Sequence, residues 1–147
     1  MMNLSKNCKI TRHSNAVAAG TSTITPASGI DMQGFEGCLF IVNMGTITST
    51  AVTSIKVQQS DDDSSYADLE GTSVSIADDD DNLIFYIDVV KPSDRYLKLI
   101  VTRGTANAVV DGITAIQYGP NKAPTTHDSS TVASESETHV SPAEGTA

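Results

Sequence analysis

The sequence has no tryptophan, few other aromatic residues, and only two cysteines, Cys8 and Cys38, among 147 residues. Two cysteines are too few for the set of disulfides that stabilises small secreted domains. We therefore interpret both as reduced thiols, in a protein that folds and assembles in a cytosol. The shortage of aromatic side chains also argues against sugar binding, because carbohydrate-binding modules stack aromatic rings on their ligands.

Long apolar runs and positive charge are scarce as well. No run approaches the ~20 residues of a transmembrane helix, and the first 20 residues lack the apolar core of a signal peptide. Nine basic residues face 18 acidic ones, giving a net charge of −9, and such a charge repels nucleic-acid phosphates. Lys6, Lys9 and Arg12 form a weak basic cluster, which we interpret as a solvated terminus. We expect neither a nucleic-acid partner nor a membrane partner.

Motifs of the common catalytic and nucleotide-binding sites are missing too. The sequence contains no G-x-S-x-G, H-E-x-x-H or C-x-x-C motif, no Walker-type loop and no dinucleotide fingerprint. His127 and His139 lie twelve residues apart without a nearby cysteine, and His13 is remote from both, so a zinc site is not indicated. We predict a protein that is not an enzyme, with no catalytic residue, no metal ligand and no cofactor.

Two aspartate runs, Asp61–Asp63 and Asp78–Asp81, are the densest groups of oxygen ligands. Calcium sites use such carboxylates, but neither run has the D-x-D-x-D-G spacing followed by a bidentate glutamate. The alternative is that both runs are hydrated turns between strands, where aspartate hydrogen-bonds the local backbone. We favour the turns.

Strand-forming residues are abundant, and they are densest between Asn82 and Arg103. Apolar residues occupy both faces of 83–90, whereas 97–102 alternates in the manner of a half-buried strand. Lys91-Pro92-Ser93-Asp94 between them is rich in turn formers. We predict that 82–90 and 95–103 form a central antiparallel pair, with the first strand covered on both faces.

Further short strands are indicated before and after this pair. Gly37–Asn43 is apolar on both faces and predicts a central strand, and Val52–Gln59 alternates with Thr53, Ile55 and Val57 inward. Other candidates are 16–19, 22–25, 29–32, 66–69, 73–77 and 107–118, the last with a bulge at Asp111-Gly112. Seven to nine short strands separated by polar turns predict a mainly β chain forming a single antiparallel β-sandwich, with a jelly roll as one possible strand order.

The two ends of the chain differ from its centre. We expect residues 1–13 to form an arm or a first edge element, residues 14–118 the β-sandwich, and residues 119–147 an extended C-terminal arm. After Tyr118 the sequence is rich in Ser, Thr and Pro and poor in large aliphatic residues, so it cannot build a core of its own. Candidate contacts to another subunit lie at the start of one strand and in this arm: Arg95, Tyr96, His127, Val132, His139 and Val140.

Several segments, taken in order, resemble a family of small tailed-bacteriophage head proteins. The matching pieces are 15–22 (NAVAAGTS), 35–37 (FEG), 57–62 (VQQSDD), 66–72 (YADLEGT), 89–92 (VVKP), 95–96 (RY), 108–112 (AVVDG), 116–119 (IQYG), 124–128 (PTTHD) and 139–146 (HVSPAEGT). The resemblance extends over nearly the whole chain, but no single motif in it is chemically diagnostic.

This resemblance implies a structural protein of the virion, assembled in the host cytoplasm, that decorates and reinforces the capsid exterior as a cement protein does. Its implied partners are the major capsid protein and other copies of itself, as a dimer or trimer. A head fibre, connector or tail component is an alternative within the same class. The segments 60–62 and 66–69 also resemble parts of carbohydrate-binding β-sandwiches, which makes a glycan-binding module the alternative from another class.

Overall fold

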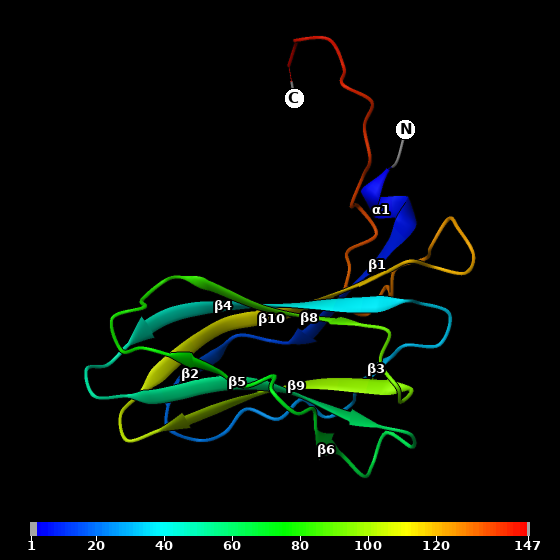
Figure 1. Cartoon of the computed structure of the whole chain (residues 1–147). Coiled ribbons are helices and arrows are strands. Elements are labelled where there is room, and N and C mark those ends of the chain that lie inside the picture. The colour runs from blue at the N-terminus through cyan, green and yellow to red at the C-terminus, as the bar shows by residue number, and fades with distance from the viewer. Residues whose placement is uncertain (1–2, 147) are drawn as a thin grey trace.

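The computed structural model describes residues 3–146 as one short helix followed by strands (Figure 1). Short polar turns separate the strands, as the sequence predicts. The helix is α1 (Leu4–Asn7). The strands are β1 (Cys8–Ser14), β2 (Val17–Gly20), β3 (Ile30–Asp31), β4 (Gly37–Ile47), β5 (Val52–Ser60), β6 (Ala67–Asp68), β7 (Val74–Ile76), β8 (Ile84–Val90), β9 (Tyr96–Gly104) and β10 (Ala108–Tyr118).

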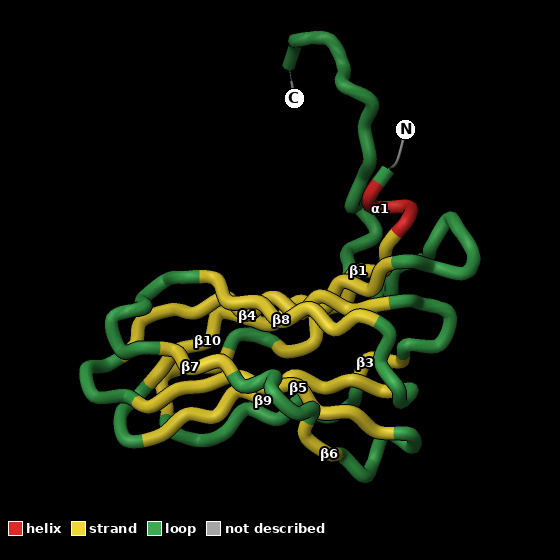
Figure 2. The backbone as a smooth tube through the Cα atoms, viewed as in Figure 1, coloured by secondary structure: helices red, strands yellow, loops and turns green. Residues whose placement is uncertain are grey.

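The strands form two antiparallel sheets that pack face to face (Figure 2). In sheet A the order is β1-β10-β4-β8, and β2 pairs with β10 beyond the end of β1. In sheet B the order is β3-β9-β5-β6, and β7 also pairs with β5. The prediction of a mainly β antiparallel sandwich is therefore confirmed. Over residues 3–146, no helix has the length and apolar character needed to cross a membrane.

The core lies between the two sheets and is built from alternate residues of the long strands. Phe40 and Val42 of β4 and Leu99 of β9 are fully buried. On β5 the inward residues are Thr53, Ile55 and Val57, as the alternation predicts, and β4 lies centrally between β10 and β8. The bulge predicted at Asp111-Gly112 is also confirmed, since the register with β4 shifts between Val110 and Gly112.

The predicted central pair is wrong. β8 pairs with β4 in sheet A, whereas β9 pairs with β5 and β3 in sheet B. The connection 91–95 therefore crosses from one sheet to the other, beginning at Lys91, which has φ +50° and donates its N–H to the Glu36 carbonyl at 2.7 Å. A crossing of this kind needs the same turn-forming residues as a hairpin, so the local sequence could not tell the two apart.

The expectation that β8 is covered on both faces is also wrong: its outer face is exposed, and the strand lies at the edge of sheet A. Its inward residue Ile87 is buried, but Ile84, Tyr86 and Val90 are exposed. Strand β9 differs from its prediction in the opposite sense, because Lys98 and Ile100, on the side expected to face solvent, are buried. Lys98 lies over the ring of Tyr66, 3.9 Å from its centroid.

Strand β1 begins at Cys8, so residues 8–13 form an edge element of sheet A, the second of the two expectations for the N-terminus. The register with β10 shifts between Arg12 and Ser14, and His13 turns inward at this irregularity. Its Nε2 accepts a hydrogen bond from the Leu99 N–H at 3.2 Å, and its ring lies 5.4 Å from that of Phe40. The side chain therefore links the two sheets. The remaining division into arms and sandwich stays a prediction.

Gly37 is required by the side chain of Tyr118. The Tyr118 ring crosses β4 above Gly37, and its hydroxyl donates to Asp88 Oδ1 on β8 at 2.7 Å. A Cβ at Gly37 would lie 2.4 Å from the ring, closer than side chains pack. Burial and this carboxylate together raise the pKa of Tyr118 to about 12.

We expect Gly37→Ala to destabilise the protein by about 1–3 kcal/mol, because Tyr118 must leave its position to admit the methyl group. Urea denaturation measures the change. The matched control is Gly104→Ala, whose Cβ would find its nearest neighbour at 3.8 Å and should be nearly neutral. Equal effects at the two positions would show that the Tyr118 contact is unimportant.

Candidate interaction surface

The exposed apolar residues of β8 all lie on the outer side of sheet A. Ile84 is 64%, Tyr86 68% and Val90 62% exposed, and Leu83 just before the strand is 49% exposed. Isolated exposed apolar residues are ordinary, but a contiguous group on one strand marks an interaction site. This group is the strongest functional feature of the described surface.

The pairing register extends this group across the sheet. Ile41 lies opposite Tyr86, and Leu39 lies opposite Ile116 of β10, which in turn lies opposite Ile10 of β1. These four aliphatic residues are half-buried. Because residues opposite each other share a face, the outer side of sheet A carries one apolar band. We call it the outer apolar face: Ile10, Leu39, Ile41, Ile84, Tyr86, Val90 and Ile116.

The C-terminal tail covers one end of this face, at β1. The Thr125 N–H donates to the Lys6 carbonyl at 2.9 Å, and the Ile10 N–H donates to His127 Nδ1 at 3.1 Å. Val132 is half-buried in a small pocket that Ile10 and His127 also line. The tail therefore closes the free edge of β1 with its own polar groups and one aliphatic side chain.

Beyond Val132 the tail passes the N-terminal helix, where residues 136–138 face Ser5 and Lys6, and then leaves the sandwich. Residues 133–146 are exposed and project away on the side of sheet A (Figure 1). Thr138 and Ser5 share a hydrogen bond of 2.6 Å, and His139 lies 2.8 Å from Glu137, but Val140 is 84% exposed. The four candidate tail residues thus divide into His127 and Val132, which contact the sandwich, and His139 and Val140, which project from it.

Arg95 is the last residue of the connection from β8 to β9, and Tyr96 is the first residue of β9. Arg95 donates two hydrogen bonds to the Asp31 carboxylate, at 2.9 and 2.7 Å, and lies 5.1 Å from the centroid of the Tyr96 ring. The guanidinium holds the pKa of Asp31 below its usual value. Since both partners are nearly half exposed, the pair orients Arg95 more than it stabilises the fold.

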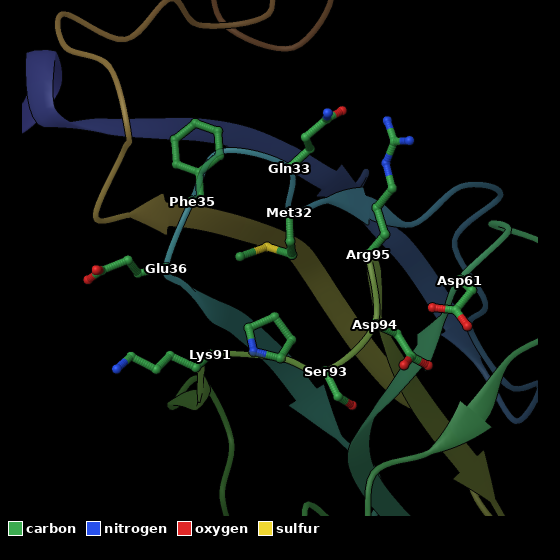
Figure 3. A pocket seen from close by; sticks show the side chains of 10 residues that line it. Met32, Gln33, Phe35, Glu36, Asp61, Lys91, Ser93, Asp94 and Arg95 are labelled. Carbon is green, nitrogen blue, oxygen red and sulfur yellow. The ribbon is translucent and has the colours of Figure 1, made fainter.

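Arg95 also borders an open cleft of about 570 Å³ (Figure 3). Lys91 and Glu36 lie at one end of the cleft, Arg95, Asp94 and Asp61 lie at the other, and Phe35 and Met32 lie between the two ends. The structure thus separates the six candidate contact residues into two places: Arg95 at this cleft with Tyr96 against its guanidinium, and the other four along the tail.

Carboxylates of both aspartate runs accept hydrogen bonds from backbone N–H groups. Asp62 accepts the N–H groups of Ser64 and Ser65, and these bonds hold its pKa well below the usual value. Asp78 accepts the Thr50 N–H, and Asp81 accepts the Ile47 N–H. Asp62 therefore fixes its own turn, whereas Asp78 and Asp81 join theirs to Ile47 and Thr50. Within residues 3–146 no three His, Cys, Asp or Glu side chains form a group suited to a metal ion.

The exposed residues of β8 were missed by sequence reasoning. Their signal was present, since 83–90 is apolar on both faces, but that pattern is typical of a buried strand. The same pattern becomes an exposed surface here because, in the described residues, sheet A packs against sheet B on its inner side and β8 lies at its edge.

Comparisons with known proteins reveal a shared fold. No protein-family model and no curated protein sequence matches the chain. Among solved structures, the PBSX exported protein XepA is similar, with a TM-score of 0.52 and 16% identity over 98% of this chain. A protein of the disulfide-linked pili of Bacillus endospore appendages matches more weakly, with a TM-score of 0.45 and 9% identity over 82% of this chain and 96% of that one. The chain spans 46% of the length of XepA and has the fold of that part.

Proposed function

We propose that this chain is a non-enzymatic structural protein of a phage particle, attached to the outer surface of the capsid as a decoration or cement protein. The sandwich supplies a rigid body, and the C-terminal tail supplies the attachment. The partner is the shell formed by the major capsid protein.

The observation that carries this proposal is the division of the tail into a bound part and a projecting part. Thr125 and His127 anchor the tail to the edge of the sandwich, so residues 133–146 start from a fixed point. Fourteen residues can reach at most about 50 Å when extended, far enough to cross onto a neighbouring subunit. Pro142 restricts the free chain, which lowers the entropy lost when the tail is ordered on a partner.

The fold and the sequence each support the proposal that this is a phage protein. XepA, which shares the fold, is an exported protein of the phage-derived PBSX. The segments described above resemble small phage head proteins along nearly the whole chain. A structural protein outside the shell also tolerates a net charge of −9, because it has no contact with the packaged genome.

The glycan-binding alternative has one supporting feature, the cleft beside Arg95. Phe35 offers a ring there, and Asp61, Asp94 and Arg95 offer hydrogen-bonding groups. A sugar-binding module binds its ligand as a free domain, whereas a decoration protein binds assembled heads. A glycan array probed with the purified protein, beside a head-binding assay, separates the two functions.

The test of the proposal is a deletion of residues 133–147. We expect the truncated protein to keep its melting temperature, because the anchoring residues remain, and to bind heads at least about tenfold more weakly through loss of the tail contacts. The heads are those of the encoding phage, purified without this protein, and occupancy is measured across a titration. The matched control carries residues 133–147 in scrambled order, with unchanged length and charge.

Two outcomes contradict the proposal. If full-length protein does not bind heads, the chain is not a decoration protein. If full-length and truncated proteins occupy heads equally, attachment does not use the tail. If the scrambled control binds heads as strongly as the natural protein, then the tail contributes through its charge and length and not through its residue order.

A further inference from the structure

Each of the two sheets has two edges, and the chain covers three of these four itself. The tail lies along β1 through Thr125 and His127. In sheet B, the edge of β9 is covered by β3, by the His13 hydrogen bond to Leu99 and by a bridge from Ile24 to Val101. The edge of β5 is covered by β6 and β7. Within residues 3–146, β1 and β8 are the two outer strands of sheet A, and the tail bonds to the outer edge of β1 but not to that of β8.

The backbone of β8 is ready to pair. Its register with β4 continues without a shift from Ile84 to Val90. The Lys91 N–H bonds to Glu36 and the Leu83 carbonyl bonds to Met44, so odd-numbered residues bond to β4. In an antiparallel pair the bonded residues alternate, so the N–H and C=O groups of Ile84, Tyr86, Asp88 and Val90 point toward the open edge.

Strand β8 lacks most of the features that normally prevent an edge strand from pairing with another chain. Native edges carry lysines, prolines, bulges or inward-pointing charges. Within Ile84–Val90 there is one charge, Asp88, and no proline or bulge. On the inner side, Phe85 and Val89 at the rim of the core are half-buried, so a further strand would complete their burial.

We propose that β8 pairs with β8 of a second copy, antiparallel across a twofold axis, joining the two A sheets into one. The alignment that uses every free backbone group places Ile84 opposite Val90 of the second copy and Tyr86 opposite its Asp88. On the inner side it places Phe85 opposite Val89 and Ile87 opposite itself. This inference concerns self-association and is independent of attachment to a capsid.

A second copy of β8 is a suitable partner because, in this alignment, the side chains of the two strands are complementary. Aliphatic residues meet aliphatic residues, and Asp88 meets Tyr86 rather than a second Asp88, so no like charges are opposed. A foreign strand would have to reproduce all these matches.

Two substitutions at one exposed position test the pairing and its register. Tyr86→Asp places a carboxylate opposite Asp88 twice in each dimer, and we expect dimerisation to weaken about tenfold or more. Tyr86→Lys, equally polar, places an ammonium opposite Asp88, and we expect the dissociation constant to stay within about threefold of the natural protein. Because strand-edge interfaces are small, sedimentation is measured from about 1 µM to 1 mM.

Amide exchange gives a second measurement on the full chain. The amides of Tyr86, Asp88 and Val90 should become protected as concentration rises, whereas those of Phe85, Ile87 and Val89 should be protected throughout. A chain that is monomeric at 1 mM overturns the proposal and leaves β8 open for a strand of another protein. Dimers that survive Tyr86→Asp place the interface elsewhere. Equal weakening by both substitutions overturns the register, because it indicates a dimer formed through the apolar side chains alone.

Discussion

Phe40→Ala is expected to lower the free energy of unfolding by about 3–5 kcal/mol, because Phe40 is fully buried between the sheets. It lies on the central strand β4, opposite Ala115 of β10 and Ile87 of β8. Its ring also packs against His13, which bonds to sheet B. Removing it leaves a cavity where both sheets meet, and the strands on either side cannot both close in.

The measurement is urea denaturation followed by circular dichroism at low micromolar concentration. The matched control is Tyr86→Ala, which removes an aromatic ring from the outer face and should change stability by about 0.5 kcal/mol or less in the monomer. A cost below about 1.5 kcal/mol for Phe40→Ala, or equal costs for both substitutions, would contradict the assignment of inner and outer faces of sheet A.

Acidification from pH 7 to pH 4 is expected to remove about 3 kcal/mol of stability through His13 alone. Burial, with a smaller effect of Lys98, lowers the pKa of His13 from 6.5 to about 4. The neutral ring is needed because its Nε2 accepts the Leu99 N–H, and a protonated ring cannot accept it.

The sign of this change in stability follows from the number of protons bound by the folded and unfolded states. Between pH 6.5 and 4 the unfolded chain binds a proton at His13 that the folded protein does not, so stability falls as the pH falls. The contribution is complete above pH 6.5 and absent below pH 4. Carboxylates with lowered pKa, such as Asp31 and Asp63, lose their contributions at more acidic pH, below their usual value of 3.8.

His13→Gln separates these effects. The glutamine amide oxygen can still accept the Leu99 N–H but does not titrate. We expect the variant to be less stable than the natural protein at pH 7 and to lose little stability between pH 6.5 and 4. Unfolding free energies at half-unit pH steps measure both profiles. Parallel profiles over this window would show that His13 titrates normally in the folded state.

Local sequence was sufficient to predict the long strands from Gly37 onward and much of what lies on their inner faces, whereas the strand predicted at 22–25 is wrong, since only Ile24 bridges to Val101 there. The alternation of Thr53, Ile55 and Val57 placed them inward, and the Asp111-Gly112 pair marked the bulge. These features depend on side-chain alternation and backbone preference within a few residues, both of which can be read from the chain directly. The change in composition after Tyr118 likewise marked the point where the last strand ends.

Tertiary structure decided which strands are neighbours. A backbone hydrogen bond is the same whichever residues it joins, so the sequence of 82–103 could not specify that β8 pairs with β4 and β9 with β5. For this reason Phe85, which the alternation places in a covered central strand, is only half-buried at a sheet edge. A strand that is apolar on both faces is buried only when it has neighbours on both edges and layers on both faces. Because β8 lies at the edge of sheet A, Ile84, Tyr86 and Val90 on its outer face are exposed.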